Sequence, residues 1–229
     1  MAAGLNKASL QKRVLSALAI GPLSLFIIWY GGAPFFLLLL VSLFISINEW
    51  YGLAQKLKQA NLHFLIVGSL YIGVAFYSFY LCRGLGTSNI WLLLFMVWSS
   101  DIGAYFAGKL IGGPKLIPQI SPNKTWAGLV GALVSPIIIL VIYFFFSHGS
   151  SELSPFLIAL IIVIGALVGL IGQVGDLMMS FVKRLANVKD TGKIIPGHGG
   201  VLDRIDSLLL VTPIFYVLVK YLNIIVTIS

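Results

Sequence analysis

Long apolar runs alternate with short polar segments along nearly the whole chain. A helix needs about 20 mostly apolar residues to cross the hydrocarbon core of a bilayer. Seven runs approach this length, and they predict helices over roughly 14–31, 34–54, 62–82, 89–110, 127–147, 155–182 and 206–228. The pattern therefore predicts an all-α, polytopic integral membrane bundle of about seven transmembrane helices. We expect residues 1–229 to form a single membrane domain.

The first run resembles a signal peptide, because Lys12 and Arg13 precede its apolar residues. No small-x-small cleavage site follows it, so we expect the run to be retained as an anchor. The second run is the weakest, since its last turn holds Asn48 and Glu49. The simplest interpretation of Glu49 is an interfacial acid near Lys56.

Composition supports a membrane protein. Hydrophobic residues make up 59% of the chain and charged residues 10%, against roughly 25% charged residues in soluble domains. The net charge is +8. With seven runs crossing the membrane, thirteen of the fifteen Lys and Arg fall on one side and two, Arg83 and Lys220, on the other. An excess of Lys and Arg marks the cytoplasmic side. This distribution predicts a cytoplasmic N-terminus and argues against a nucleic-acid partner.

Acidic residues are rare and gather near one surface. Five of the seven lie in, or at the inner ends of, the last four runs: Asp101, Asp176, Asp190, Asp203 and Asp206. Asp101 and Asp176 lie within apolar runs, where a carboxylate costs on the order of 2.5–3.5 kcal/mol to insert. Acids at such depth are functional candidates, although a structural pair with a Lys would also explain them.

Residues 189–207, KDTGKIIPGHGGVLDRIDS, concentrate charge and glycine. The glycines would let backbone N–H groups approach a phosphate closely, although a plain tight turn is the more usual reason for such a stretch. Asp203 and Asp206 are spaced to share a helix face, and helix capping alone would explain one of them. His198 by itself is more often a hydrogen-bonded loop residue than a ligand.

The other inner loop contains SPNKTWAG, residues 121–128. Ser121 followed by Pro122 predicts a helix start, with Ser121 as the N-cap. Lys124 would then lie in the first turn, where a cation is disfavoured unless an anion binds there. Carboxylates for Mg²⁺ with cations for phosphate are what phosphoryl-type transfer needs. One Cys and three scattered His are a poor set for zinc.

The run from Ser180 to Asp206 closely resembles the signature of the phosphatidate cytidylyltransferases, also called CDP-diacylglycerol synthases. The signature is Ser, two residues, Lys-Arg, four residues, Lys-Asp, then Pro-Gly-His-Gly-Gly and Asp-Arg-x-Asp, and every spacing is met. WSSDIGAYFAGKLIGG and SPNKTWAG are also similar to the family, so residues 98–207 carry the catalytic motifs. The family often has Lys and Glu where this chain has Asn123 and Ala127.

The resemblance implies that CTP and phosphatidate give CDP-diacylglycerol and pyrophosphate with Mg²⁺, in phospholipid biosynthesis. A second, monovalent cation is left open. It also implies a homodimer in a bacterial-type inner membrane, with a polar cavity open to the cytoplasm and to lipid.

On this basis we expect catalytic roles for Asp101, Asp176, Lys183, Asp203 and Asp206, and metal ligation by Asp176, Asp203 and Asp206. Substrate-binding roles are expected for Ser121, Lys124, Arg184, Lys189, Asp190, Gly197, His198, Gly199, Gly200 and Arg204.

Two rival interpretations remain at this point. A CTP-dependent polyprenol kinase, or a cytidylyltransferase acting on another lipid phosphate, would need a similar site. A transporter that couples ions through intramembrane Asp is disfavoured. Transporter sites lie near the bilayer midplane between paired repeats, whereas the charged residues here gather in inner loops and at inner helix ends, and the sequence shows no repeat.

Overall fold

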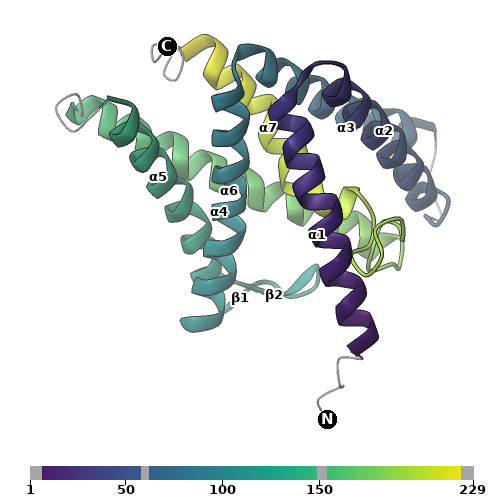
Figure 1. Cartoon of the computed structure of the whole chain (residues 1–229). Coiled ribbons are helices and arrows are strands. Elements are labelled where there is room, and N and C mark those ends of the chain that lie inside the picture. Colours follow the sequence, from purple (N-terminus) through teal and green to yellow (C-terminus); the bar gives the residue numbers. More distant parts are fainter. Residues whose placement is uncertain (1–6, 58–61, 149–153, 223–229) are drawn as a thin grey trace. The chain divides into compact units, whose positions relative to one another are not determined.

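The computed structural model describes residues 7–57, 62–148 and 154–222, which form seven helices and one two-stranded hairpin (Figure 1). The helices are α1 (Lys7–Tyr30), α2 (Gly32–Ala54), α3 (Leu62–Leu85), α4 (Thr87–Leu110), α5 (Trp126–His148), α6 (Pro155–Leu185) and α7 (Leu202–Leu222). Each predicted apolar run falls on one of these helices. The last predicted run extends to 228, and its final residues lie outside those the structure describes.

Among the described residues, five helices, α2 to α6, are long and apolar enough to cross a membrane. Helix α1 is apolar over a shorter stretch, Leu18–Tyr30. Large apolar side chains cover much of the surface, and Phe44 and Phe146 are 71% and 82% exposed. A surface this apolar is suited to lipid rather than to water. The predicted class, a mainly helical chain with several membrane-spanning helices, is therefore supported.

The predicted helix start at Ser121 is wrong. Residues Ser121–Thr125 form strand β2, which pairs antiparallel with β1 (Lys115–Ile117), and α5 begins only at Trp126. The hydroxyl of Thr125 accepts the Gly128 N–H at 3.1 Å, so Thr125 occupies the N-cap position that was assigned to Ser121. Pairing with β1 keeps the backbone extended up to Thr125, which overrides the local Ser-Pro signal.

The chain divides into two compact units. We call Met1–Phe76 with Val182–Ile205 the loop unit, because it contains the glycine-rich loop, and Tyr77–Phe181 with Asp206–Ser229 the cavity unit. Helices α6 and α7 contribute residues to both. The prediction of a single membrane domain stays a prediction.

In the loop unit, Trp50 joins α2 to α3. Its ring stacks on Phe64 with centroids 4.5 Å apart, and its Nε1 donates to the Phe64 carbonyl at 3.3 Å. A Cβ at Gly68 would collide with the same indole ring. The glycine therefore makes room for the tryptophan that packs these two helices together.

In the cavity unit, small residues let the helix backbones approach closely, as is common between membrane helices. Helices α4 and α5 run beside each other from the hairpin (Figure 1). A Cβ at Gly128 would lie 2.9 Å from the Ala104 carbonyl oxygen, and one at Gly165 on α6 would lie 2.7 Å from the Ile137 Cα on α5. The contact between α5 and α6 is therefore made by main-chain atoms that have no room to yield.

We predict that Gly165→Ala destabilises the protein by roughly 1–3 kcal/mol, the usual cost of overpacking a tight contact. Thermal unfolding in detergent measures this as a lower transition temperature. Gly73→Ala is the matched control, because nothing lies within 4 Å of a Cβ at Gly73 on α3. Equal transition temperatures for the two variants would contradict the close packing of α5 and α6.

Candidate active site

A polar cavity of about 510 Å³ lies in the cavity unit. This volume is within the range, roughly 300–1,000 Å³, that holds small-molecule ligands. Three carboxylates line it, Asp101 from α4, Asp176 from α6 and Asp206 from α7, together with Lys124 from the hairpin. Four of the predicted site residues, spread over more than one hundred positions, therefore meet at one cavity.

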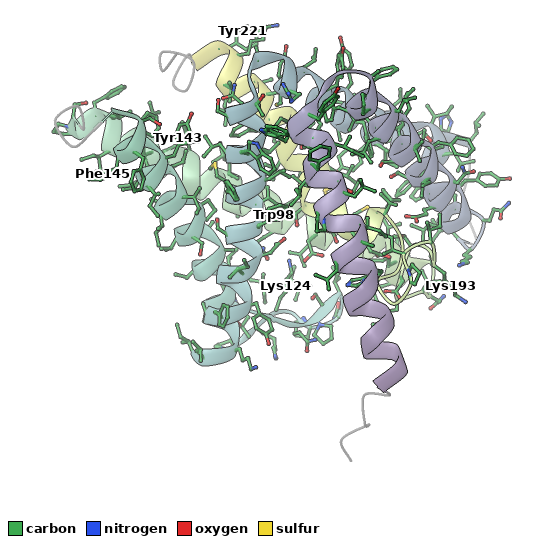
Figure 2. The ribbon with its side chains drawn as sticks, in the orientation of Figure 1. Trp98, Lys124, Tyr143, Phe145, Lys193 and Tyr221 are labelled. Atoms are coloured by element: carbon green, nitrogen blue, oxygen red, sulfur yellow. The ribbon has the colours of Figure 1, made fainter. Side chains whose placement is uncertain are left out.

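Lys124 is fixed by two side chains one turn apart on α6. Its Nζ lies 2.7 Å from Asp176 Oδ2 and donates to Gln173 Oε1 at 2.8 Å. Asp176 Oδ1 accepts a longer hydrogen bond, 3.3 Å, from the Ser180 hydroxyl. Figure 2 labels Lys124 beside the hairpin, away from Tyr143 and Phe145 on α5. The hairpin thus places the ammonium group of Lys124 against the carboxylate of Asp176 on α6.

Asp206 reaches the cavity because α6 and α7 touch at a glycine. A Cβ at Gly175 would lie 2.9 Å from the Asp206 carbonyl oxygen. This contact brings the first turns of α7 against the turn of α6 that carries Asp176. Asp206 Oδ1 accepts the backbone N–H of Ser207 at 2.8 Å.

In the loop unit, Asp203 is the centre of a buried hydrogen-bond cluster. Lys183 Nζ lies 2.8 Å from its Oδ1. Its Oδ2 accepts the backbone N–H groups of Thr191 at 2.7 Å and Gly200 at 3.0 Å. Asp203 precedes the apolar run that begins at 206. Burial by itself would raise the pKa of Asp203, but these donors, Lys183 foremost, together hold the pKa below its ordinary value.

The glycine-rich loop folds back on itself. Ile195 N–H donates to the Gly199 carbonyl, and His198 N–H donates to the Ile195 carbonyl, both at 2.9 Å. Gly199 has φ +87°, a conformation that favours glycine. The N–H groups of Ile195 and His198 are therefore used within the loop, and that of Gly200 donates to Asp203, which leaves the predicted backbone contact with phosphate to other members of the loop.

Ser16 on α1 contacts this loop. Its Oγ lies 3.0 Å from the Pro196 carbonyl oxygen and 3.0 Å from His198 Nδ1. Because Nδ1 is engaged, Nε2 is the ring nitrogen with which His198 would meet a phosphate oxygen. Ser16 was not identified from the sequence.

The remaining predicted residues are placed as follows. Arg184, Lys189, Asp190, Gly197 and Arg204 are exposed members of the loop unit, and Ser121 is half-buried at the start of β2. Asp203 and Lys183 belong to the loop unit, whereas Asp176 and Asp206 line the cavity. The metal set of Asp176, Asp203 and Asp206 therefore stays a prediction.

A sequence profile described as the cytidylyltransferase family matches residues 55–222, which is most of the chain. The chain belongs to the cytidylyltransferase family. Its resemblance to that family, first drawn from the signature, is confirmed, and the protein is a nucleotidyltransferase.

Curated relatives agree with the family assignment. A phosphatidate cytidylyltransferase of Rickettsia felis is 34% identical over 216 residues, covering 92% of each chain. One of Brucella suis is 30% identical over 257 residues, covering 91% of this chain and 92% of the relative. One of Staphylococcus haemolyticus is 40% identical over 155 residues, 68% of this chain and 58% of the relative.

The interpretation of Glu49 as an interfacial acid near Lys56 is wrong. Glu49 is buried, and its carboxylate accepts hydrogen bonds from Thr191, Val201 and Leu202. It lies before the segment that the family profile matches. An acid at the inner end of a weak apolar run was the available signal, but its partners lie about 150 residues away in the sequence.

We predict that Asp203→Asn loosens the glycine-rich loop of this cytidylyltransferase. Losing the partner of Lys183 and weakening the bonds from Thr191 and Gly200 costs roughly 1–3 kcal/mol. That corresponds to about a 5- to 150-fold larger open population, since each 1.4 kcal/mol is tenfold.

Trypsin cleavage after the exposed Lys193 measures the open population when opening is fast relative to cleavage. Asp206→Asn is the matched control, because it makes the same change in the cavity unit. Equal cleavage rates for wild type and Asp203→Asn would contradict this role of Asp203.

Proposed function

We propose that this cytidylyltransferase makes CDP-diacylglycerol and pyrophosphate from CTP and phosphatidate. The relatives are named as phosphatidate cytidylyltransferases, and the full signature is present in residues 180–206. The observation that carries the proposal is the cavity itself. It gathers three carboxylates and two lysines, Lys109 and Lys124, from four separate segments in a chain otherwise poor in charge.

The reaction joins two anions. An oxygen of the phosphatidate phosphomonoester forms a bond to the α-phosphorus of CTP, while the bond from that phosphorus to the bridging oxygen of the β-phosphate breaks. The electron pair leaves with pyrophosphate. Since phosphatidate brings its own nucleophile, the protein's contribution is to position the reactants and to offset their charge.

The cavity carboxylates fit Mg²⁺ by their chemistry. Mg²⁺ prefers oxygen ligands and is commonly held by one or two carboxylates plus substrate phosphates and water. Within the described residues, no three His, Cys, Asp or Glu side chains are grouped so that they could hold a metal ion by themselves. Asp176 and Asp206 would hold it, with Asp101 and Asp203 as further candidates. Bound Mg²⁺ would neutralise phosphate charge.

The basic residues would bind the phosphate groups of the two substrates. Lys124 lies at the cavity wall against Asp176 and would bind a CTP phosphate. Ser121 lies on the same strand. Lys183, Arg184, Lys189 and Arg204 would hold the triphosphate and the lipid phosphate. His198 would hydrogen-bond a phosphate oxygen through Nε2, as a donor when the ring is doubly protonated, since its Nδ1 faces Ser16. Asp190 would orient the neighbouring lysine.

The membrane arrangement follows from the charge distribution. Thirteen of fifteen Lys and Arg fall on one side when all seven helices cross the bilayer, so we place that side, with the N-terminus and the active site, in the cytoplasm. The protein would lie in a bacterial-type inner membrane, where both CTP and phosphatidate are accessible. By its resemblance to the family it would act as a homodimer.

An assay of purified protein tests the proposal directly. With Mg²⁺, phosphatidate and CTP labelled in the cytosine base, label should appear in lipid as CDP-diacylglycerol, with equimolar pyrophosphate. A parallel assay uses CTP labelled in the γ-phosphate. Appearance of this label in lipid, without base label in lipid, would instead indicate a lipid kinase and would refute the proposal.

We predict that Asp176→Asn lowers kcat by at least about 100-fold, the scale seen when one electrostatic group of a preorganised site is removed. The variant should still insert in the membrane and purify as folded protein. Glu152→Gln is the control, because it removes an acid that lies between the fifth and sixth apolar runs of the sequence, outside the described residues. Near-normal turnover by Asp176→Asn would remove this residue from the metal site.

A further inference from the structure

Glu49 on α2 is a buried acid that the reaction described above does not use. Glu49 is only 6% exposed. Oε1 accepts the Val201 N–H at 2.9 Å, and Oε2 accepts the Leu202 N–H at 2.9 Å. These two N–H groups stand at the beginning of α7, where backbone donors have no partner within the helix.

The charge of Glu49 is met by hydrogen-bond donors rather than by a cation. In the described part of the chain the two ion pairs join Lys124 to Asp176 and Lys183 to Asp203. A buried carboxylate is costly unless it is well hydrogen-bonded, and the first turn of a helix also attracts negative charge. Glu49 is thus an N-terminal cap that a different helix supplies to α7.

The loop is shaped to admit this carboxylate. A Cβ at Gly192 would lie 2.6 Å from Glu49 Oε1, and a Cβ at Gly200 would collide with the same carboxylate. A side chain at Gly192 would displace the Glu49 carboxylate from this position, and one at Gly200 would displace both that carboxylate and the Thr191 hydroxyl. Gly200 is also the last glycine of the PGHGG segment.

Thr191 links Glu49 to Asp203. Its Oγ1 lies 3.0 Å from Glu49 Oε2 and 3.0 Å from Asp203 Oδ2. The hydroxyl has one hydrogen, so it donates to one carboxylate at a time. A change at Glu49 will therefore alter how Thr191 holds Asp203, and with it the loop between them.

We propose that Glu49 is a positioning residue, which fixes the glycine-rich loop and the start of α7 so that Asp203, and Lys183 bound to it, are held in place for the reaction. The proposal rests on the proposed function for its kinetic effect. The hold on the loop itself can be measured without any substrate.

Glu49→Gln is the decisive variant. It keeps the shape of the side chain. Its amide nitrogen, however, would face an N–H or hydroxyl donor that in the wild type donates to a carboxylate oxygen, so that hydrogen bond would be lost. We expect kcat to fall by about 10- to 100-fold, the cost of a small misplacement of reacting groups, while KM for CTP changes little. A wild-type kcat in this variant would overturn the proposal.

Thr191 provides the coupled test. Thr191→Ser keeps the hydroxyl and should retain wild-type kcat, whereas Thr191→Val should lose activity as Glu49→Gln does. Thr212→Val is the matched control, because Thr212 is also buried and its hydroxyl donates within α7, to the Leu208 carbonyl. The double variant of Glu49→Gln and Thr191→Val should be about as active as the weaker single variant. A loss equal to the product of the two single losses would overturn the link.

Two further outcomes keep the test decisive. If Glu49→Gln is not recovered as folded protein, Thr191→Val against Thr191→Ser decides, and equal kcat values overturn the proposal. Trypsin cleavage after Lys193, without substrate, should be faster in Glu49→Gln than in wild type. If wild type makes no CDP-diacylglycerol, the proposed function fails while faster cleavage still supports the hold on the loop. Unchanged cleavage in a protein whose wild type is active overturns only the role of Glu49.

Discussion

A carboxylate that leaves water must be matched by hydrogen-bond donors, and here those donors come from distant segments. Asp203 is held by Lys183 and by backbone N–H groups of the loop, and Asp176 by Lys124 from the hairpin. A chain with few charges cannot satisfy such acids by chance contacts. Within residues 189–201, Thr191, Gly200 and Val201 are held by hydrogen bonds to the buried acids Asp203 and Glu49.

The helices could be predicted because each apolar run is long enough to be unambiguous. The meeting of Asp101, Lys124, Asp176 and Asp206 could also be anticipated, since alternating spans bring the ends of α4, α5, α6 and α7 to one side. What the apolar pattern alone does not contain is how closely the helices approach. That distance is set by glycines such as Gly128, Gly165 and Gly175, at which main-chain atoms of neighbouring helices touch.

Two features escaped prediction for different reasons. The Ser121-Pro122 pair is a good local start signal, but strand pairing of Ser121–Thr125 with Lys115–Ile117 delays the helix to Trp126. Tertiary context outweighs local preference there. Glu49 escaped because its partners are backbone groups at 201 and 202, and backbone groups leave no mark on the sequence. Its interpretation as an interfacial acid near Lys56 relied on closeness in the sequence, and the burial of Glu49 contradicts it.

The position of Glu49 also bears on where an autonomous piece of this fold would begin. The segment that the family profile matches starts at residue 55, after α1 and α2. A shortened chain starting there would retain the whole signature yet lose Ser16 and Glu49, two described side chains that reach the signature loop from the first helices. The profile-matched segment therefore lacks contacts that hold its own signature loop, and the first 54 residues are more than a membrane tether.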